Sequence, residues 1–555
     1  MVIEMAGQRL RQLAVSGLIL SGLLGVGASA HDNKDRDNDN DTGWPSAGQN
    51  LGNTRHQEHG GRISVHSVGG LTQKWVFTTE GDVSATPAVD EHTVYFPDWA
   101  GNLYAVNRKT GAQVWKVSVG AASGTPGDKA RATPVITGNK IIVGTQGNVF
   151  APPPYGGPGG KMMAFNKHSG ALLWATQLDS HYGAIITQSA TVHGDRVYIG
   201  VASLEEALAG SLGFCCTFRG SMLALDVNTG AILWKTYMVP PGYSGGAIWG
   251  SSPAVDVKRG QIYIATGNNY SVPETARQCV IAAGTDTNAV KACLAADNYF
   301  DAVLALDMRT GAVRWVTKAL PADTWIAACI GFGDPALCPS PTGPDYDFGQ
   351  APALFTVKAD DRGGHKGDGR HDDDHDGRGK PTDVVGAGQK SGKYWALNPD
   401  TGAVKWVTQA GPGGTGGGLQ WGSAVDGKRV YTANANSDAV PWPAAGGLTS
   451  GVWSGIDAVT GQLLWQVRPS GGGSTSGPVT TTNGVVFGCS LDRSNGYMYA
   501  LDAATGVELW KFSSGGSCLS GAAISKGDVF WGSGYSNLFG AFGGPNNKLY
   551  AFEIR

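Results

Sequence analysis

The sequence predicts an all-β protein, an eight-bladed β-propeller, from its composition, from a repeat that ends in tryptophan, and from half-repeats at its two ends. Among its 555 residues are 85 Gly and 17 Trp, whereas only 16% of the residues are charged. An average globular protein has about 7% Gly and about 25% charged residues. This balance favours short strands joined by tight turns over long surface helices, which would require more Glu, Lys and Arg.

Seven copies of one pattern carry the fold prediction. Each copy reads apolar–Ala/Gly–apolar–Asp/Asn, two residues, Thr/Ser–Gly, three residues and Trp, with minor slips. The apolar residues alternate as in a half-buried strand, the Asp or Asn can bond turn amides, and Gly supplies a positive φ. The closing Trp can bury about 200 Å² between neighbouring sheets. Such a hairpin cannot bury its own face and must stack on further copies. The copies end at Trp115, Trp174, Trp234, Trp315, Trp406, Trp465 and Trp510.

An eighth copy is divided between the two ends of the chain. The segment "LTQKW" ends at Trp75, and the chain finishes with "KLYAFEIR". Pairing the N-terminal and C-terminal strands would close a ring and remove its free sheet edges. Residues 44–555 are therefore predicted to form one propeller, with a linear solenoid as the alternative.

The N-terminus has the pattern of an export signal. Basic residues are followed by an apolar run and by small residues that end at Ala30. Residues 1–30 are predicted to be a signal peptide, with a transmembrane anchor as the alternative. Residues 31–43 are predicted to be a polar, disordered leader, and the mature protein to be periplasmic or secreted without a membrane span. A polar run at about 360–380, rich in His, Asp, Gly and Lys, is predicted to be a flexible insertion.

Several function classes are not supported by the sequence. The net charge is −3 and no basic stripe is present, so nucleic acid is not an expected partner. No phosphate loop and no dinucleotide fingerprint stand in the required context. The motif CxxCH is absent, so no covalently bound haem c is expected. Export permits disulfides, and the eight Cys predict four local pairs. The expected pairs are Cys215–Cys216, Cys279–Cys293, Cys329–Cys338 and Cys489–Cys518.

The repeat resembles the tryptophan-docking motif of the pyrroloquinoline quinone (PQQ)-dependent quinoprotein alcohol dehydrogenases. The opening "GWPSAGQNLGNTRHQ", from Gly43 to Gln57, is similar to the start of those enzymes. The segments "GDVSATPAVDEHTVYFPDWAGNLYAV" and "CCTFRGSMLALD" resemble the polyvinyl alcohol dehydrogenase branch. The resemblance covers about Trp44 to Arg555, without the haem c domain of that branch.

The resemblance implies a fold, an activity and partners. It implies PQQ and Ca²⁺ as cofactors and the oxidation of secondary alcohols, such as polyvinyl alcohol, to ketones. An external acceptor such as cytochrome c would receive the electrons. Two alternatives stay open: a non-enzymatic propeller scaffold of the bacterial envelope built from the same repeat, and a PQQ sugar dehydrogenase.

The resemblance also implies the metal ligands and the catalytic base. Glu205, in "IGVASLEEALAG", and Asn268, in "ATGNNY", match ligands to calcium, with Glu206 and Asn269 as alternatives. Oxygen ligands of this kind suit a hard divalent cation. Asp347, in "PDYDFGQAP", matches the base, which also ligates the metal. The neighbouring Asp345 is the residue most easily confused with it, and Gly349 stands where lanthanide-using relatives have an additional Asp, which favours calcium.

Further residues match the cofactor site of this family. Trp249, in "AIWGSSPAVD", lies outside the repeat register and matches the indole that supports the flat quinone. Lys390, in "GQKSGKYWALN", matches the cation that contacts the quinone oxygens. Thr187 and Ser203 match hydroxyl donors to the cofactor. The Cys215–Cys216 pair would cover the face opposite the Trp, although methanol-type enzymes carry their pair one blade earlier.

Overall fold

The computed structural model describes residues 43–149, 157–358, 380–443, 446–536 and 543–555, all in one compact unit that begins at Thr42. Apart from Gly43 and Lys380, the predicted signal peptide, leader and flexible insertion lie outside the described residues. Among the described residues, no helix is long and apolar enough to cross a membrane.

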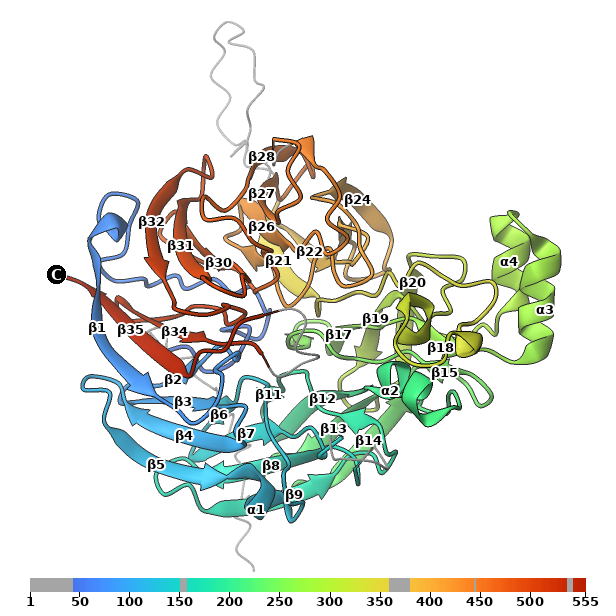
Figure 1. Ribbon diagram of the computed structural model, residues 1–555, viewed down its shortest axis with the longest axis horizontal. Coiled ribbons are helices and arrows are strands. Elements are labelled where there is room, and N and C mark those ends of the chain that lie inside the picture. The colour runs from blue at the N-terminus through green and yellow to red at the C-terminus, as the bar shows by residue number, and fades with distance from the viewer. Residues whose placement is uncertain (1–42, 150–156, 359–379, 444–445, 537–542) are drawn as a thin grey trace, which may run out of the picture. The chain divides into compact units, whose positions relative to one another are not determined.

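Eight antiparallel sheets follow one another around a common axis, so the predicted eight-bladed propeller is confirmed (Figure 1). Within a sheet, the strands run in chain order from the axis outward, and the repeat Trp lies on the outermost strand.
The first four sheets contain β2 (Ala88–Val89), β3 (Thr93–Pro97), β4 (Asn102–Asn107) and β5 (Gln113–Ser118); β6 (Val135–Thr137), β7 (Lys140–Gly144), β8 (Lys161–Asn166) and β9 (Leu172–Gln177); β10 (Ala184–Ile185), β11 (Thr191–His193), β12 (Arg196–Ser203), β13 (Ser221–Asp226) and β14 (Ile232–Tyr237); and β16 (Ala254–Asp256), β17 (Gln261–Ala265), β19 (Ala302–Asp307) and β20 (Val313–Lys318).

The other four sheets repeat the same order, and the last one joins the two ends of the chain.
They contain β21 (Ala353–Val357), β22 (Thr382–Gly388), β23 (Lys393–Leu397) and β24 (Val404–Gln409); β25 (Ala424–Val425), β26 (Arg429–Asn434), β27 (Val452–Asp457) and β28 (Leu463–Val467); β29 (Thr480–Thr482), β30 (Val485–Cys489), β31 (Tyr497–Asp502) and β32 (Glu508–Ser513); and β33 (Ala523–Ser525), β34 (Asp528–Ser533), β35 (Lys548–Ile554) and β1 (Leu71–Thr78).
The remaining elements are a small ladder of β15 (Ser244–Gly245) and β18 (Asn269–Ser271), the helices α1 (Val119–Ser123), α2 (Glu205–Leu212), α3 (Glu274–Ala283) and α4 (Thr287–Cys293), and the 3-10 turns η1 (Val68–Gly70), η2 (Ala327–Ile330) and η3 (Pro335–Leu337).

The ring closes as the sequence predicts. Strand β1 pairs antiparallel with β35, from Leu71 opposite Ile554 to Thr78 opposite Lys548. In Figure 1 the blue first strand and the red last strand lie side by side. The ends of the chain therefore form one sheet.

Each repeat Trp packs on the turn of the following sheet. The Nε1 of Trp174 on β9 donates to the carbonyl of Val227 at 3.1 Å, one residue after Asp226. A Cβ on Gly230, which has a φ of +73°, would lie 2.6 Å from Cε3 of that indole. The glycine is therefore required both by the turn and by the indole on it.
The same donation to the next turn is made by Trp75, Trp115, Trp234, Trp315 and Trp465, and Trp510 donates to the carbonyl of Leu71 at the start of β1.

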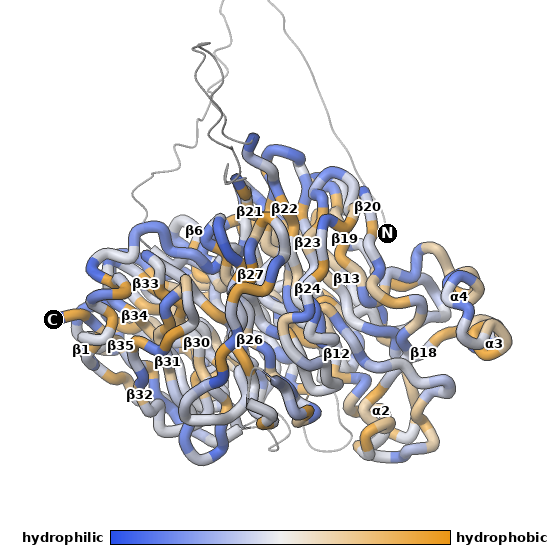
Figure 2. The backbone as a smooth tube through the Cα atoms, turned by 90° about the horizontal axis from the view of Figure 1, so that it is seen from above, coloured by the Kyte–Doolittle hydropathy of each residue, from blue (hydrophilic) through white to orange (hydrophobic). Residues whose placement is uncertain are grey.

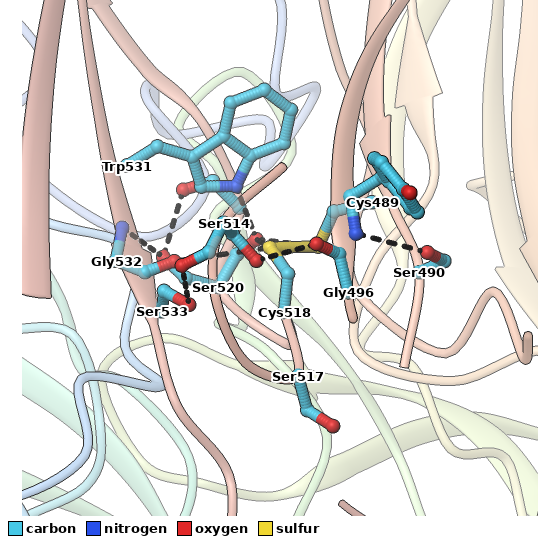
Figure 3. The surroundings of a disulfide bond; sticks show 12 residues. Cys489, Ser490, Gly496, Ser514, Ser517, Cys518, Ser520, Trp531, Gly532 and Ser533 are labelled. Atoms are coloured by element: carbon cyan, nitrogen blue, oxygen red, sulfur yellow. Dashed lines mark hydrogen bonds between the residues drawn. A yellow bond between two sulfur atoms is a disulfide. The ribbon is translucent and has the colours of Figure 1, made fainter. Parts of the chain in front are cut away.

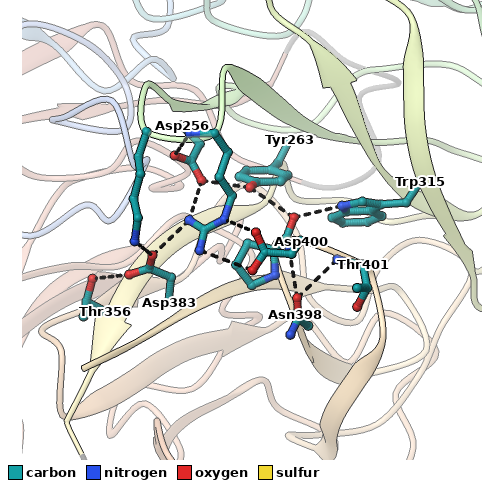
Figure 4. Close-up of polar contacts among 11 residues, drawn as sticks. Asp256, Tyr263, Trp315, Thr356, Asp383, Asn398, Asp400 and Thr401 are labelled. Atoms are coloured by element: carbon teal, nitrogen blue, oxygen red, sulfur yellow. Dashed lines mark hydrogen bonds and ion pairs between the residues drawn. The ribbon is translucent and has the colours of Figure 1, made fainter. Parts of the chain in front are cut away.

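Polar contacts reinforce some of these junctions, as between the fourth and fifth sheets (Figure 4). Arg259 bonds Asp256 on β16 at 2.9 Å, Asp383 on β22 at 2.9 Å and Asp400 at 2.7 Å. In the same view, Trp315 reaches the turn that precedes β24. Figure 2 shows hydrophobic segments within the strands and hydrophilic segments at many of the connecting loops, as expected of sheets that stack face to face.

An N-terminal strap, residues 43–57, crosses the axial ends of the sheets. Its backbone bonds the inner strands or adjoining loops of the first, second, fourth, fifth, sixth and seventh sheets, and Gln57 reaches the eighth. The bonded partners are Val89, Ile136, Val255, Leu354, Val425, Thr481 and Ile524. This strap is the segment that resembles the start of the quinoprotein dehydrogenases, and it ties seven of the eight sheets together.

All four predicted disulfides are present, namely Cys215–Cys216, Cys279–Cys293, Cys329–Cys338 and Cys489–Cys518. The Cys489–Cys518 bond joins β30 of the seventh sheet to the loop that leads to β33 of the eighth (Figure 3). The Cys279–Cys293 bond links α3 to α4 at the edge of the ring.

Candidate functional site

A cavity of about 390 Å³ lies at the axis, because its wall comes from loops of the second to the eighth sheet. The structure brings seven of the residues singled out in the sequence to this wall. They are Thr187, Ser203, Glu206, Trp249, Asp345, Asp347 and Lys390. Segments up to about 200 residues apart in the chain thus meet at one site.

Asp347 is held from both sides of its carboxylate. Trp249 Nε1 donates to Oδ2 at 2.8 Å, and the backbone N–H of Asn268 donates to Oδ1 at 2.7 Å. Lys390 Nζ lies 3.3 Å from Oδ2, and the Asp347 residue is only 3% exposed. Asp347 is therefore held in a fixed orientation, as a base requires.

Lys390 is the positively charged residue in a cluster of acidic side chains. Its Nζ bonds Asp345 Oδ1 at 3.0 Å and lies 5.5 Å from the centre of the Trp249 ring. Burial lowers the pKa of Lys390, but the charges of Asp345, Asp347 and Glu206 outweigh burial and raise it above its ordinary value. Lys390 is therefore a permanent cation at the cavity wall. Burial also raises the pKa of Asp345 well above its ordinary value, and Asp347 and Glu206 add to that effect.

The neighbouring oxygen atoms fit a hard cation. Asn268 Oδ1 is buried and has no hydrogen-bond partner among the described residues. The Nδ2 of the same amide donates to the carbonyls of Asn269 and Trp325, which fixes its orientation. Burial raises the pKa of Glu206 at the cavity wall to about 7, which Lys390 opposes and Asp347 reinforces. An unpaired neutral oxygen and desolvated carboxylates are ligands that calcium prefers.

The protein does not supply a complete metal site by itself. Within the described ranges, no group of three or more His, Cys, Asp and Glu side chains is arranged to hold a metal ion. A cation here would therefore need oxygen atoms of a bound cofactor in addition to those of Asn268, Glu206 and Asp347.

The predicted ligand Glu205 faces away from this cavity. Its side chain is fully buried at the start of α2 and accepts bonds from Tyr182 Oη at 2.7 Å, Phe218 N at 2.8 Å and Thr217 N at 2.9 Å. Its neighbour Glu206 lines the cavity. The geometry thus favours the alternative Glu206 as the metal ligand.

Asn269 is likewise less available than Asn268. Its amide exchanges two hydrogen bonds with Asn298, at 3.0 and 2.8 Å, and also donates to the carbonyl of Ser244. The side-chain oxygen of Asn269 already accepts one hydrogen bond, whereas that of Asn268 accepts none from a described residue. Of the two asparagines, Asn268 is therefore the better candidate ligand.

The remaining predicted cofactor residues divide into two groups. Thr187 lines the cavity and donates to the carbonyl of Trp249 at 3.0 Å, and Ser203 lines it while accepting from the Glu205 amide at 2.8 Å. The Cys215–Cys216 disulfide is not among the residues of the cavity wall. It lies instead in the loop whose next two amides hold Glu205.

The sequence prediction missed a cationic part of the wall around Arg131. The Arg131 guanidinium lies 4.9 Å from the Trp421 ring centre, 5.3 Å from that of Trp99 and 5.8 Å from that of Tyr535. Trp421 packs edge-on against Trp249, with ring centres 5.2 Å apart. Trp421 stands outside the repeat register, and this signal, which identified Trp249, could have found it too.

Known proteins with similar sequences or folds support this architecture. The family model described as "Outer membrane protein assembly factor BamB" (PQQ_2) matches residues 58–317 and 390–543. A polyvinylalcohol dehydrogenase of Pseudomonas sp. is 28% identical, covering 92% of this chain and 77% of the relative. The polyvinylalcohol dehydrogenase of Sphingopyxis sp. (strain 113P3) is 29% identical, covering 89% and 73%. Among solved structures, quinohemoprotein alcohol dehydrogenase ADHIIG from Pseudomonas putida HK5 has the same fold, with a TM-score of 0.66 at 17% identity over 92% of this chain and 80% of that one.

Proposed function

The chain belongs to the PQQ_2 family, whose model is described as outer membrane protein assembly factor BamB, and we propose that it is a PQQ-dependent alcohol dehydrogenase within that family. The observation that carries the proposal is the fixed carboxylate of Asp347, held by Trp249 and Asn268 beside Lys390 on a cavity of about 390 Å³. The two polyvinylalcohol dehydrogenases, which align over about nine-tenths of the chain, support it.

The residues present fit the cofactor and its metal. Trp249 and Thr187 would hold the flat quinone. Glu206, Asn268 and Asp347 would ligate calcium, with Glu205 as the alternative to Glu206. When bound, PQQ supplies an acceptor for two electrons, and the metal ion supplies positive charge beside its oxygens.

The proposed chemistry of the chain itself is proton removal and orientation. Oxidation of a secondary alcohol to a ketone removes the hydroxyl proton and a hydride from the carbinol carbon. Asp347 takes the proton as general base, because its two bonds hold the carboxylate toward the cavity. Lys390 stabilises negative charge that develops nearby. The apolar wall, which includes Trp325 and Phe332, excludes water from the reacting centre.

The finer assignments rest on the sequence. We propose polyvinyl alcohol or related secondary alcohols as substrates, since the curated relatives carry that name. Calcium is favoured over a lanthanide by Gly349. The N-terminal signal pattern supports a periplasmic or secreted protein. The absence of CxxCH from the sequence supports an external electron acceptor such as cytochrome c.

Reconstitution tests the proposal. The purified chain is incubated with PQQ and calcium and assayed on secondary alcohols with an artificial electron dye. We expect Asp347→Asn to lower the turnover number at least about 100-fold while PQQ still binds. Asp400→Asn, which alters a carboxylate on a turn outside the cavity, should keep full activity. Full activity of Asp347→Asn would refute the assignment of the base.

A second experiment separates the enzyme from an envelope scaffold, the reading that the description of the family model favours. PQQ should change its absorption spectrum when the chain binds it, and Trp249→Ala should weaken that binding. A chain that leaves the PQQ spectrum unchanged at high concentration would support the non-enzymatic scaffold.

A further inference from the structure

A second, smaller chamber lies on the axis between the N-terminal strap and the main cavity. Its volume is about 50 Å³, and the strap contributes Ala47 and Arg55 to its wall. Arg131, Thr187, Trp421 and Leu519 line both this chamber and the main cavity, so the two adjoin each other. One water needs about 10–15 Å³ by this measure. The chamber therefore has room for a small ion with a few waters, but not for an organic cofactor.

Arg55 is seated rigidly in this wall. It is only 1% exposed, and it donates from Nε to the carbonyl of Val479 at 3.2 Å and from Nη2 to Thr86 Oγ1 at 3.1 Å. A Cβ on Gly422 would lie 2.9 Å from its Cδ, and one on Gly521 would lie 2.7 Å from its Nη2. Two backbone segments thus clamp the guanidinium in place.

Among the residues that the structure describes, no carboxylate balances this positive charge. The wall of the chamber contains no Asp or Glu, and neither Arg55 nor Arg131 forms an ion pair with a described residue. Burial lowers the pKa of Arg55 to about 9, and no neighbouring acid raises it again. The side chain is therefore still charged at neutral pH. Two buried cations beside one polar chamber are costly unless an anion lies between them.

The hydroxyl groups of the wall are arranged to donate. Thr86 Oγ1 accepts from Arg55 Nη2 and from the Gly521 amide, and Ser84 Oγ accepts from Trp99 Nε1 at 2.8 Å. Ser251 Oγ accepts from the Ala351 amide at 3.1 Å. A hydroxyl whose oxygen already accepts keeps its proton for a further acceptor. Such groups suit an anion.

We propose that this axial chamber is a binding site for a monatomic monovalent anion of the chloride type, held between Arg55 and Arg131. The ion neutralises the two guanidinium groups and bonds the Thr86 and Ser84 hydroxyls. It connects the N-terminal strap with the floor of the main cavity. The site does not depend on the proposed dehydrogenase activity.

Crystals of the full chain soaked in bromide test the site directly. Anomalous density in the chamber is expected, both without cofactor and after loading with PQQ and calcium. Bromide confined to the protein surface would overturn the proposal. Loss of the chamber peak on loading would also overturn it, because the chamber would then belong to the cofactor site.

Thermal unfolding provides a second readout. At constant ionic strength, replacing gluconate by chloride should raise the Tm of the wild type by on the order of a few degrees. Arg55→Met should lose this response, whereas Arg55→Lys should keep part of it. Arg108→Met is the matched control, since Arg108 is also buried but pairs with Asp528 at 3.0 Å, and it should respond as the wild type does. An equal response of Arg55→Met and wild type would contradict the assignment.

Discussion

At the scale of single residues, the adjacent acids Glu205 and Glu206 have different surroundings. Glu205 is saturated by Tyr182 and by the amides of Thr217 and Phe218, which fixes the start of α2 to the disulfide loop. Glu206, one residue later on the same helix, faces the cavity. We interpret Glu205 as a positioning residue that orients Glu206.

Glu206→Gln should impair the metal site without impairing the fold. The substitution removes a carboxylate ligand, so calcium affinity in the presence of PQQ should fall at least about tenfold. The free energy of unfolding of the apo-protein should stay within about 0.5 kcal/mol of the wild type. Titration calorimetry and denaturant unfolding measure the two quantities. Because the pKa of Glu206 is raised to about 7, calcium binding by the wild type should also weaken as the pH falls below 7.

Glu205→Gln should instead lower the stability of the fold and leave calcium binding intact. A glutamine places an NH₂ group against backbone donors, so at least one buried bond to a charged acceptor is lost, at a cost of about 1.5–3 kcal/mol. Urea unfolding should show this loss in the apo-protein, and amide exchange at Thr217 and Phe218 should accelerate. Unchanged stability, together with lost calcium binding, would instead make Glu205 the ligand.

The predicted site residues that the structure brings together each stand in a short local motif. Trp249, Asp347 and Lys390 stand in distinctive segments, and the structure brings them together. Arg131 and Arg55 could not be recognised in this way, because their surroundings come from distant segments. The direction of the Glu205 and Glu206 side chains also depends on packing that the sequence does not display.

At the scale of elements, the tryptophan repeat provides a local rule that accounts for the junctions between sheets. The Asp or Asn caps the turn, the Gly provides the positive φ, and the preceding sheet's Trp packs on that Gly. The strand pairs within each repeat were predictable because their signals lie within thirteen residues of each other. Ring closure was predictable because the two halves of one repeat stand at the two ends of the chain. The strap was not foreseen as a connector, because its partners lie throughout the chain.

Trp174→Phe tests the polar part of this junction. The substitution removes the Nε1 bond to the carbonyl of Val227 together with part of the buried ring, which should cost about 1–3 kcal/mol or more. Leu173→Ala on the same strand is the control, because Leu173 is 45% exposed and its loss should change stability by no more than about 0.5 kcal/mol. Denaturant unfolding compares the two variants. Equal effects would show that the indole N–H contributes nothing.

At the scale of the whole molecule, closure through β1 and β35 makes the chain ends interdependent. Removing residues 548–555 exposes both β1 and β34 as unpaired edges and opens the ring. We expect the truncated chain to lose cooperative unfolding and to aggregate. A synthetic peptide of residues 548–555 should restore the transition in part, measured by circular dichroism. Removal of Arg555 alone, which lies beyond β35, should have no such effect.

The strap also constrains the order in which the protein can assemble. Residues 43–57 leave the ribosome before any sheet exists, yet their partners include Thr481 and Ile524, near the far end of the chain. The bonds to those late partners must wait until synthesis is almost complete, as contacts of very long sequence separation do. The bonds to Val89 and Ile136 need only the first two sheets, so the strap gains its partners in stages and its last bonds form with the last blade.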